Sequence, residues 1–424
     1  MRGPAGGRGR IDSGGHRNAR LDAAAGRPAR PGPARALAST TEGIIFTAEH
    51  ETFRHSVRGV LAREVVPHIE EWEAAGVFPA HHVFQALGAA GLLGLEYSPA
   101  YGGQGADHSY TVILGEELGR MGCAGVAMAV AVQTDMATPS LHRHGSHELK
   151  QRYLAPALRG EMVAAIAVTE HDAGSDVAGI RTRAERDGDE WVINGSKLYI
   201  TNGTQADWLC LLARTSGEGG YRGMSQIILP ADTPGFSVSR KLRKLGNHCS
   251  DTAELSFTDA RVPVSNTIGQ AGRGFQQQMG QFQNERMIAA YTAVGAMAGA
   301  LRRTADYLRE REAFGGPLLS KQYVQFRLAE LSAEVDLLRH YNYACAQAYL
   351  RGEDTTRFAS VAKLKAGRLN REIADTCLQF HGGFGYMEET WVARYFRDSR
   401  LLSIGGGADE VMLQILARLD GFSA

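Results

Sequence analysis

Two polar segments in the middle of the chain have residue types that could bind a ligand. The first, AVTEHDAGSD, includes Thr169 and ends in Gly174-Ser175-Asp176. Its backbone N–H groups and the Thr169 and Ser175 hydroxyls could form hydrogen bonds with a polar ligand. Alternatively, the glycine forms a plain turn and the aspartate caps the next segment. The residue types alone leave both interpretations open.

The second segment, YITNG, begins at Tyr199 and places an aromatic ring close to the Thr201 hydroxyl. An aromatic residue at the end of a strand usually packs into a core, but this ring could also flank a flat ligand. Further along, Glu285-Arg286 and Arg311 add charges to a helical pattern. Charged residues of this kind are usually solvated, so by themselves they indicate no particular chemistry.

The N-terminal part of the chain, which must help to position these residues, has the pattern of helices. From about Thr47, apolar residues recur at the spacing of one buried helix face. The residues of this face are Phe53, Val57, Val60, Leu61, Val65 and Ile69. Further helices are predicted at 80–92, 109–121 and 147–158. The apolar run 122–132 is too short to span a membrane and indicates a buried helix.

The period then changes to that of strands. The segment WVINGSKLYI is predicted to be a hairpin, with Asn194-Gly195 as the turn between two strands. Further strands are predicted at 208–213, 225–229 and 252–257. In the last of these Ala253, Leu255 and Phe257 alternate with polar residues.

After Gly274 the helical period returns and continues almost to the end of the chain. One predicted buried stripe consists of Leu328, Leu331, Val335 and Leu338. A second consists of Phe358, Val361, Leu369, Ile373 and the stem of Lys365. Long amphipathic segments with short breaks predict a helical bundle. The order of helices, strands and helices differs from the alternation expected of a doubly wound nucleotide-binding sheet.

Composition and charge limit the function classes. The 424 residues suggest two or three domains, and 44% hydrophobic with 22% charged residues is an ordinary globular balance. The net charge is zero overall, but residues 1–40 carry +6 and the remainder −6. This mild acidity argues against nucleic-acid binding. The five dispersed cysteines predict reduced, mostly buried thiols.

The first 40 residues are rich in Gly, Ala, Arg and Pro and lack hydrophobic periodicity. They are interpreted either as an organelle transit peptide or as the product of a start codon placed too early, and we favour the second. The predicted localisation is therefore cytoplasmic, with the mitochondrial matrix as the alternative. The predicted organisation is a disordered leader at 1–41, a helical domain at 42–164, a β domain at 165–276 and a helical bundle at 277–424.

Five motifs follow one another along the chain. They are AVTEHDAGSD, INGSKLYITNG, DTAELSFTDARVP from Asp251, REAFGGPL from Arg311 and QFHGGFGY from Gln379. In order and spacing they resemble the acyl-CoA dehydrogenase family over roughly Thr47 to Asp420, closest to its long-chain and isovaleryl branch. The resemblance implies an α+β fold, with an N-terminal helical domain, a small central β-barrel or β-sandwich domain and a C-terminal helical bundle.

The resemblance further implies a non-covalent FAD between the β domain and the bundle. The implied flavin-binding residues of the β domain are Val168, Thr169, Gly174, Ser175, Tyr199, Ile200 and Thr201, with Tyr199 where the family usually has Trp. Those implied to reach the FAD of a neighbouring subunit are Arg311, Phe314, Gln322, Gln379, Gly382 and Gly383. Ala408 and Glu410 are implied on the flavin side of the late loop, where Thr is common at the position of Ala408.

The family activity is α,β-dehydrogenation of an acyl-CoA to a trans-2-enoyl-CoA, in which a carboxylate takes the α-proton and flavin N5 accepts the β-hydride. Many members carry this glutamate in a late loop, but here the loop reads SIGGGADE and the position holds Gly406. The segment FQNERMIAA resembles the one that supplies the base in the long-chain and isovaleryl branches, which implies Glu285. Asp409 and Glu410 lie nearby, but their positions match flavin-side residues.

The resemblance assigns further roles around this base. Gly406 would leave room for the Glu285 side chain, and its backbone N–H would polarise the thioester carbonyl. Ser175, Asn284 and Arg286 are implied to contact the substrate. A base in an apolar site is expected to have its pKa raised by desolvation.

The implied partners are an acyl-CoA substrate, an electron-transfer flavoprotein and further copies of the chain in a homotetramer, with no nucleic acid, membrane span or metal. Three alternatives remain. They are an acyl-CoA oxidase that uses O2, a dehydrogenase of a carrier-protein-bound acyl thioester, and a DNA-binding relative of the fold, against which the acidic charge argues. The length and branching of the acyl chain stay open.

Overall fold

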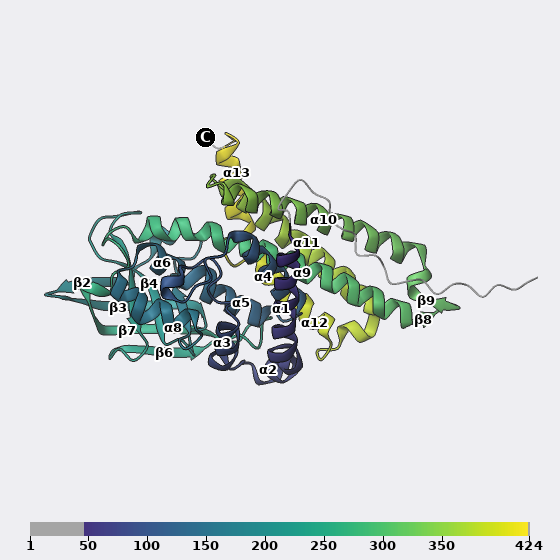
Figure 1. The fold of residues 1–424 in the computed structure, drawn as a ribbon, viewed down its shortest axis with the longest axis horizontal. Coiled ribbons are helices and arrows are strands. Elements are labelled where there is room, and N and C mark those ends of the chain that lie inside the picture. The colour runs from purple at the N-terminus through teal and green to yellow at the C-terminus, as the bar shows by residue number, and fades with distance from the viewer. Residues whose placement is uncertain (1–45, 423–424) are drawn as a thin grey trace, which may run out of the picture. The chain divides into compact units, whose positions relative to one another are not determined.

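The computed structural model describes residues 46–422. The predicted leader, residues 1–41, lies outside the described residues. From Phe46 onward the chain passes through helices, then a β sheet, then long helices, which is the predicted order (Figure 1).

Helices form the first part of the described chain. They are α1 (Ala48–Glu64), α2 (Ile69–Ala75), α3 (Ala80–Ala89), α4 (His108–Arg120) and α5 (Ala124–Ala131). The predicted face of α1 is confirmed, because Val57, Leu61 and Val65 are buried. Pro67 lacks the backbone N–H that would continue α1, and a 3₁₀ turn, η1 (Val66–His68), leads into α2.

The segment 132–158 is less regular than the single helix predicted at 147–158. It contains α6 (Pro139–His144), α7 (His147–Leu149), α8 (Ala155–Leu158) and two π-helical turns, η3 (Val132–Ala137) and η4 (Lys150–Leu154). A π-helical turn redirects side chains relative to an α-helix and is frequent at functional sites. The η3 turn carries Thr134 and Asp135.

A seven-stranded sheet forms the middle of the described chain. Its strands are β1 (Ala164–Ala167), β2 (Arg183–Asp187), β3 (Glu190–Thr201), β4 (Trp208–Arg214), β5 (Met224–Pro230), β6 (Phe236–Lys241) and β7 (Thr252–Pro263). The spatial order is β1-β4-β2-β3-β7-β6, with β5 paired to β4. The strands predicted at 208–213, 225–229 and 252–257 are confirmed. The alternating residues of β7 (Ala253, Leu255 and Phe257) are buried in the core of this sheet.

The hairpin predicted at Asn194-Gly195 is wrong. β3 continues through these residues, and it forms its hairpin with β2 around Gly188. Asn194 binds β7 instead, since its Nδ2 donates to Asp259 Oδ1 over 3.0 Å and its Oδ1 accepts from Asp259 N over 2.9 Å. The β3–β7 ladder shifts register between Ile193 and Gly195, so the glycine serves a bulge rather than a turn.

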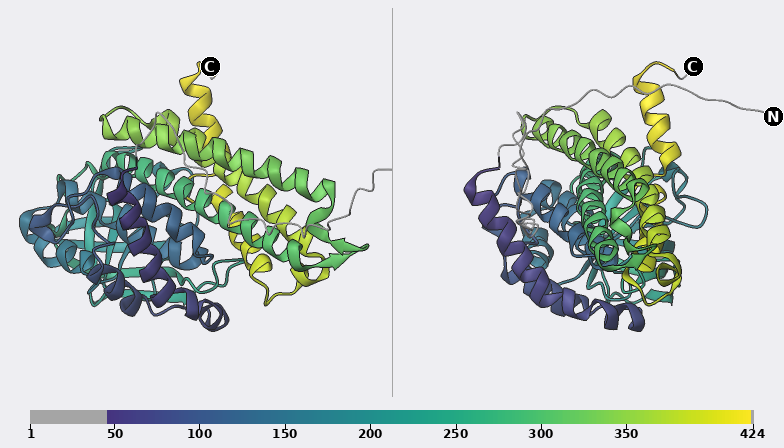
Figure 2. Two further views of the ribbon diagram at one scale, coloured as in Figure 1. Left: turned by 45° about the vertical axis from the view of Figure 1, so that its right-hand side comes forward. Right: turned by 90° about the vertical axis from the view of Figure 1, so that its right-hand side faces the viewer.

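Long helices form the last part of the chain. They are α9 (Gly274–Glu310), α10 (Gln322–Leu350), α11 (Thr356–His381), α12 (Trp391–Ser399) and α13 (Asp409–Leu419). A small hairpin of β8 (Glu312–Ala313) and β9 (Gly316–Pro317) joins α9 to α10. Figure 2 shows α9, α10 and α11 packed side by side. The stripe predicted on α10 is confirmed, because Leu331, Val335 and Leu338 are buried.

The stripe predicted on α11 is partly wrong. Leu369 and Ile373 are buried as predicted, but Lys365 is exposed and the buried lysine is Lys363. The rest of the buried face consists mainly of small residues, among them Ala359, Ala362, Ala366 and Cys377. A face of alanines has a weak hydrophobic pattern, although it allows close packing against α9.

The crossing of α4 and α9 depends on glycines. A Cβ atom on Gly119 of α4 would lie 1.8 Å from the Thr292 carbonyl oxygen of α9. A Cβ on Gly295 would lie 1.9 Å from the Glu116 carbonyl oxygen. The two backbones therefore touch, which only glycine permits. This crossing holds α9 against the N-terminal helices.

Candidate active site

Glu285 lies in the first half of α9 and is buried, with 6% of its surface exposed. Its Oε1 atom accepts long hydrogen bonds from Gln281 Nε2 (3.4 Å) and Gln278 Nε2 (3.5 Å). Gln281 Nε2 also donates to the carbonyl of Met136 in η3. One amide therefore joins the carboxyl group of Glu285 to the π-helical turn.

Burial raises the pKa of Glu285 to about 8. Desolvation is the largest cause, the Gln281 amide and the charge of Arg286 act in the opposite direction, and Asp135 raises the pKa further. The direction is the one expected for a base in an apolar site. A carboxyl group with this pKa can gain or lose a proton near neutral pH.

The two neighbours of Glu285 are also buried, with 8% of Asn284 and 7% of Arg286 exposed. Arg286 Nη1 donates to Gln283 Oε1 over 3.4 Å, while its Nε has no hydrogen-bond partner among residues 46–422. The interpretation of Glu285-Arg286 as a solvated pair on a helix is therefore wrong. The burial of three consecutive polar residues depends on the elements around α9.

The late loop is open at Gly406. This glycine has a φ of +62°, and a Cβ placed on it would meet no heavy atom of the described chain within 4 Å. It is therefore favoured for its backbone conformation rather than for close packing. Gly407 accepts a hydrogen bond at its carbonyl from the buried Lys363 Nζ of α11, which anchors the loop. The space beside Gly406 is consistent with the room expected there, but its apposition to Glu285 stays a prediction.

The other residues of the late loop have different surroundings. Ala408 is half-buried and precedes α13. Asp409 is buried, with Oδ2 lying 3.6 Å from Arg371 Nη2 and 3.7 Å from Arg368 Nε. Glu410 is exposed. Glu285 differs from both, because it is buried and forms no ion pair within residues 46–422.

The first β-domain motif is built on a buried ion pair. Lys197 Nζ of β3 lies 2.8 Å from Glu170 Oε1 and also donates to the Val168 carbonyl over 2.9 Å. Glu170 further accepts from the backbone N–H groups of Arg181 (2.6 Å) and Thr182 (3.0 Å). These bonds fix the turn that ends in the Gly-Ser-Asp triplet. The sequence analysis missed this pair, although both residues lie within the quoted motifs.

The two motifs lie side by side, because Leu198 N donates to the Thr169 carbonyl over 2.8 Å. Val168 and Ile200 are buried, Thr169 and Thr201 are half-buried, and Gly174 and Ser175 are exposed. Tyr199 is 66% exposed and has a φ of +63°. An exposed ring on left-handed backbone is costly without a compensating role, and such strain clusters at ligand sites.

The predicted FAD-binding residues of the bundle lie elsewhere. Phe314, in the β8–β9 hairpin, is 91% exposed with a φ of +54°. Arg311, Gln322, Gln379, Gly382 and Gly383 are exposed as well. Figure 1 shows this hairpin at the end of the bundle away from the sheet. One chain therefore leaves the two halves of the predicted FAD site apart.

Comparison with known proteins identifies the family of the chain. Residues 47–161, 165–260 and 272–419 match the N-terminal, middle and C-terminal domains of acyl-CoA dehydrogenase. The mitochondrial long-chain specific acyl-CoA dehydrogenase of Sus scrofa is 37% identical over 376 residues, which are 88% of this chain and 87% of that protein. The chain belongs to the acyl-CoA dehydrogenase family.

Further relatives support the predicted branch and fold. The mitochondrial isovaleryl-CoA dehydrogenase of Solanum tuberosum is 33% identical, covering 90% of this chain and 93% of that protein. The crystal structure of a probable acyl-CoA dehydrogenase from Mycobacterium abscessus has a TM-score of 0.86 and 39% identity, covering 88% and 99% of the two chains. The family resemblance and the fold class are confirmed. The domain boundaries at 164 and 276 stay predictions.

As an acyl-CoA dehydrogenase, the protein is an FAD-dependent oxidoreductase that acts on the CH–CH group of acyl-CoA thioesters. The residues of the β domain fit a flavin. Tyr199 presents an exposed ring near Thr201, and Ser175 lies at an exposed turn. A Cβ on Gly174 would meet nothing closer than 3.8 Å, so a ligand can approach this turn.

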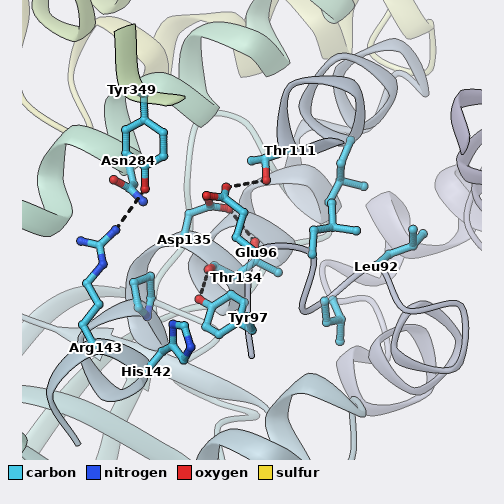
Figure 3. Close-up of a pocket in the computed structure, with 14 residues that line it drawn as sticks. Leu92, Glu96, Tyr97, Thr111, Thr134, Asp135, His142, Arg143, Asn284 and Tyr349 are labelled. Carbon is cyan, nitrogen blue, oxygen red and sulfur yellow. Dashed lines mark hydrogen bonds between the residues drawn. The ribbon is translucent and has the colours of Figure 1, made fainter. Parts of the chain in front are cut away.

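The acyl-CoA dehydrogenase also has a cavity of about 180 Å³ that the sequence analysis missed (Figure 3). Asn284 and Tyr349 line it from the bundle, and the other lining residues come from the turns that follow α3, from α4, from η3 and from α6. They are Leu92, Leu93, Leu95, Glu96, Tyr97, Thr111, Leu114, Thr134, Asp135, Pro139, His142 and Arg143. They lie outside the family motifs, so no local signal in the sequence joins them.

The remaining expectations concern thiols and membranes. All five cysteines are free and buried, as predicted. Cys123 and Cys249 come close together, with 3.4 Å between their sulfur atoms. Over residues 46–422, no helix combines the length and the apolar content that crossing a membrane requires.

Proposed function

We propose that Glu285 is the base that removes the α-proton of the acyl-CoA substrate. The observation that carries this proposal is the burial of its carboxyl group, which raises its pKa to about 8, on the helix whose preceding residue, Asn284, lines the cavity. An ionised carboxylate in such an apolar site is poorly solvated and is therefore a strong proton acceptor. Asp409 is engaged by two arginines and Glu410 is exposed, so both suit this role less well.

Other residues of the chain would bind and orient the thioester. The Gly406 N–H would donate to the thioester oxygen, where negative charge grows as the α-proton leaves. Lys363 would keep this N–H in place, because it holds the next carbonyl of the loop. Arg286, Asn284 and Ser175 would contact the substrate, and the unpartnered Nε of Arg286 supports this assignment. The bound FAD supplies the acceptor for the β-hydride.

The exposure of Phe314 supports a cofactor site shared between subunits. A large aromatic residue that is 91% exposed gains little in a single chain, and its exposed neighbours include Arg311 and Gln322. We place these residues, with Gln379, Gly382 and Gly383, on the FAD of another copy. We propose that the assembly is a homotetramer and that an electron-transfer flavoprotein accepts the electrons from the reduced flavin. We also propose a cytoplasmic localisation.

Anaerobic flavin reduction tests the proposed base. Purified holoenzyme is mixed with a panel of acyl-CoAs while the flavin absorbance is followed, first for the wild type and then for Glu285→Gln. We expect the wild type to bleach and the variant to bleach ~10³-fold more slowly, because the proton acceptor is lost. Glu71→Gln is the matched control, since the Glu71 side chain is 77% exposed.

Three outcomes would oppose part of the proposed function. Wild-type rates in Glu285→Gln would remove Glu285 from the role of base. Failure of every acyl-CoA to bleach the wild type, while acyl carrier-protein thioesters do bleach it, would assign a different substrate carrier. Rapid peroxide formation when the reduced enzyme meets O2 would favour an oxidase over a dehydrogenase.

A further inference from the structure

The cavity lies near the proposed base, although the Glu285 side chain is not part of its lining. Asn284, which lines it, directly precedes Glu285 in α9. Asp135, which also lines it, directly precedes Met136, and the Met136 carbonyl binds the same Gln281 amide that contacts Glu285. The charge of Asp135 also acts on Glu285, so the two carboxyl groups are near each other, and we take an acyl chain with its α-carbon at Glu285 to extend toward this cavity. This step rests on the proposed function of Glu285.

Part of the cavity wall suits an alkyl chain, and part of it does not. The leucines at 92, 93, 95 and 114 give it an apolar side. Two acidic side chains, Glu96 and Asp135, also line it, and Figure 3 shows their carboxyl groups turned toward each other. An alkyl chain in the cavity would exclude water from these carboxyl groups and leave their free oxygens unpaired, which is costly.

Glu96 is a carboxylate, and only one of its two oxygens is hydrogen-bonded to other residues. Its Oε1 lies 2.7 Å from His108 Nδ1 and accepts from Thr111 Oγ1 over 2.7 Å. His108 is itself fixed, because its Nε2 lies 3.1 Å from the Tyr291 hydroxyl. Burial alone would raise the pKa of Glu96, but these partners hold it below its ordinary value. Its second oxygen, Oε2, has no hydrogen-bond partner in the part of the chain that the structure describes.

Asp135 is 8% exposed and also has one engaged oxygen. Its Oδ2 lies 2.6 Å from Thr134 Oγ1, which is also 2.9 Å from the Val130 carbonyl. The threonine has one hydroxyl hydrogen and cannot donate to both. A protonated Asp135 resolves this conflict by donating to Thr134, and burial raises the pKa of Asp135 to about 7. The other oxygen, Oδ1, then remains as an acceptor without a partner among residues 46–422.

The two free acceptor oxygens limit which chemical groups on an acyl chain can bind in the cavity. Glu96 Oε2 and Asp135 Oδ1 are both acceptors, so they need a hydrogen-bond donor. A methyl-terminated chain would leave both oxygens desolvated and unpaired. A chain that ends in a carboxylate would place a third acidic group beside them. Arg143 helps to hold the pKa of Glu96 down through its charge, but its guanidinium donates its hydrogen bond to the Tyr349 hydroxyl at 3.3 Å and not to either carboxyl group.

We propose that the acyl group of the substrate carries a hydrogen-bond donor, a hydroxyl or an amino group, which contacts Glu96 and Asp135 in this cavity. The two residues determine the substrate specificity of the dehydrogenase and take no part in proton abstraction. A hydroxyl group can donate to one acceptor and accept from a third group, whereas an ammonium can donate to both carboxyl groups.

Binding of inert analogues tests the proposal independently of catalysis. Thioether analogues of acyl-CoA, which cannot be dehydrogenated, are prepared in matched sets of equal chain length ending in methyl, hydroxyl, amino or carboxylate. We expect the holoenzyme to bind the hydroxyl or the amino set about ten-fold more tightly than the methyl set. The comparison of hydroxyl with amino identifies the donor. The corresponding acyl-CoAs should show the same order in kcat/KM.

Variants test whether the two carboxyl groups cause the preference for analogues that carry a hydrogen-bond donor. Asp135→Leu and Glu96→Leu should lose the preference for a donor and bind methyl-terminated chains more tightly than the wild type does. Asp135→Asn keeps the size of the side chain and covers the case in which the leucine variant does not fold. Asp375→Leu, at an exposed position of α11, is the matched control and should bind the analogues in the same order of affinity as the wild type.

The outcomes separate this proposal from that of the base. Equal or tighter binding of the methyl set by the wild type would overturn the substrate inference and leave Glu285 untouched. A donor preference that survives in Asp135→Leu and Glu96→Leu would also overturn it. Analogues that bind in the expected order, with acyl-CoAs that fail to reduce the flavin, would uphold the inference and refute the proposed base.

Discussion

Gln281 Nε2 lies 3.4 Å from Glu285 Oε1, one helical turn earlier on α9. The same side chain donates to the Met136 carbonyl and accepts from Ser140 Oγ over 2.7 Å. It therefore ties the proposed base to the N-terminal helices. Of the groups that oppose the rise in the pKa of Glu285, it is the strongest.

Gln281→Leu should make Glu285 a weaker acid. Loss of the amide removes a hydrogen bond to the carboxylate, so the pKa of Glu285 should rise further above about 8. The variant should also lose about 1–3 kcal/mol of stability, because Ser140 and Met136 keep buried polar groups without a partner. The pH profile of flavin reduction and urea unfolding measure the two effects. Gln276→Leu, exposed on the same helix, is the control, and an unshifted profile would contradict the prediction.

Activity should rise with pH. A base must be ionised, and the pKa of Glu285 is about 8, so kcat/KM should increase toward a plateau above that pH. The slope should approach ten-fold per pH unit well below the pKa. Stopped-flow measurement of flavin reduction at pH values below and above the pKa records this rise in kcat/KM. A profile that is flat from pH 6 to pH 9 (roughly two units below and one above the pKa) would be inconsistent with Glu285 as the base.

Stability should show the opposite trend. Between its ordinary value of 4.5 and about 8, Glu285 is protonated in the folded protein and ionised in the unfolded chain. Its contribution to stability is therefore complete below pH 4.5 and is lost as the pH rises through 8. Asp135 and Asp398, with pKa values of about 7, act in the same direction. The difference in unfolding free energy between the wild type and Glu285→Gln isolates Glu285, and it should fall with rising pH.

The ion pair of Lys197 with Glu170 should be important for the β domain. Lys197→Met would leave a buried, uncompensated carboxylate, which costs about 3–5 kcal/mol. The double variant Lys197→Met with Glu170→Gln should recover part of this loss. Denaturant unfolding measures stability, and the ratio of flavin to protein reports on the Ser175 turn. Equal stability of the single variant and the wild type would show that the pair contributes little.

Phe314→Ala should act on assembly rather than on the single chain. Because Phe314 is 91% exposed, its loss should change the stability of an isolated subunit by no more than about 0.5 kcal/mol. If another copy covers it, the variant should lose FAD and the mass of the assembly should fall. Light scattering and flavin absorbance measure both. Val238→Ala, at an exposed residue of β6, is the control. Full retention of FAD and of assembly mass would contradict the shared site.

Much of the fold follows from local patterns. The buried faces of α1 and α10 and the alternation in β7 depend on residues close together in the chain, which periodicity detects. The motifs around Thr169, Tyr199 and Glu285 are also continuous, so the family resemblance and the proposed base could be predicted from the amino acids alone.

Other features depend on partners that are distant along the chain. Asn194-Gly195 has the composition of a hairpin turn, but the bonds of Asn194 to Asp259 keep it inside a long strand. The hydrogen bond that joins Gln281, and through it Glu285, to the Met136 carbonyl also spans more than a hundred residues of sequence.

The sequence by itself therefore determined the order of elements, the family and the identity of the candidate base. Tertiary structure alone decided that Glu96 and Asp135 share one cavity next to Asn284. The physical reason is that periodicity and motifs record contacts between near neighbours. Desolvation of Glu285 and the pairing of Glu96 with Asp135 arise only when the turns after α3 pack together with α4, η3 and α9, and no local pattern encodes that packing.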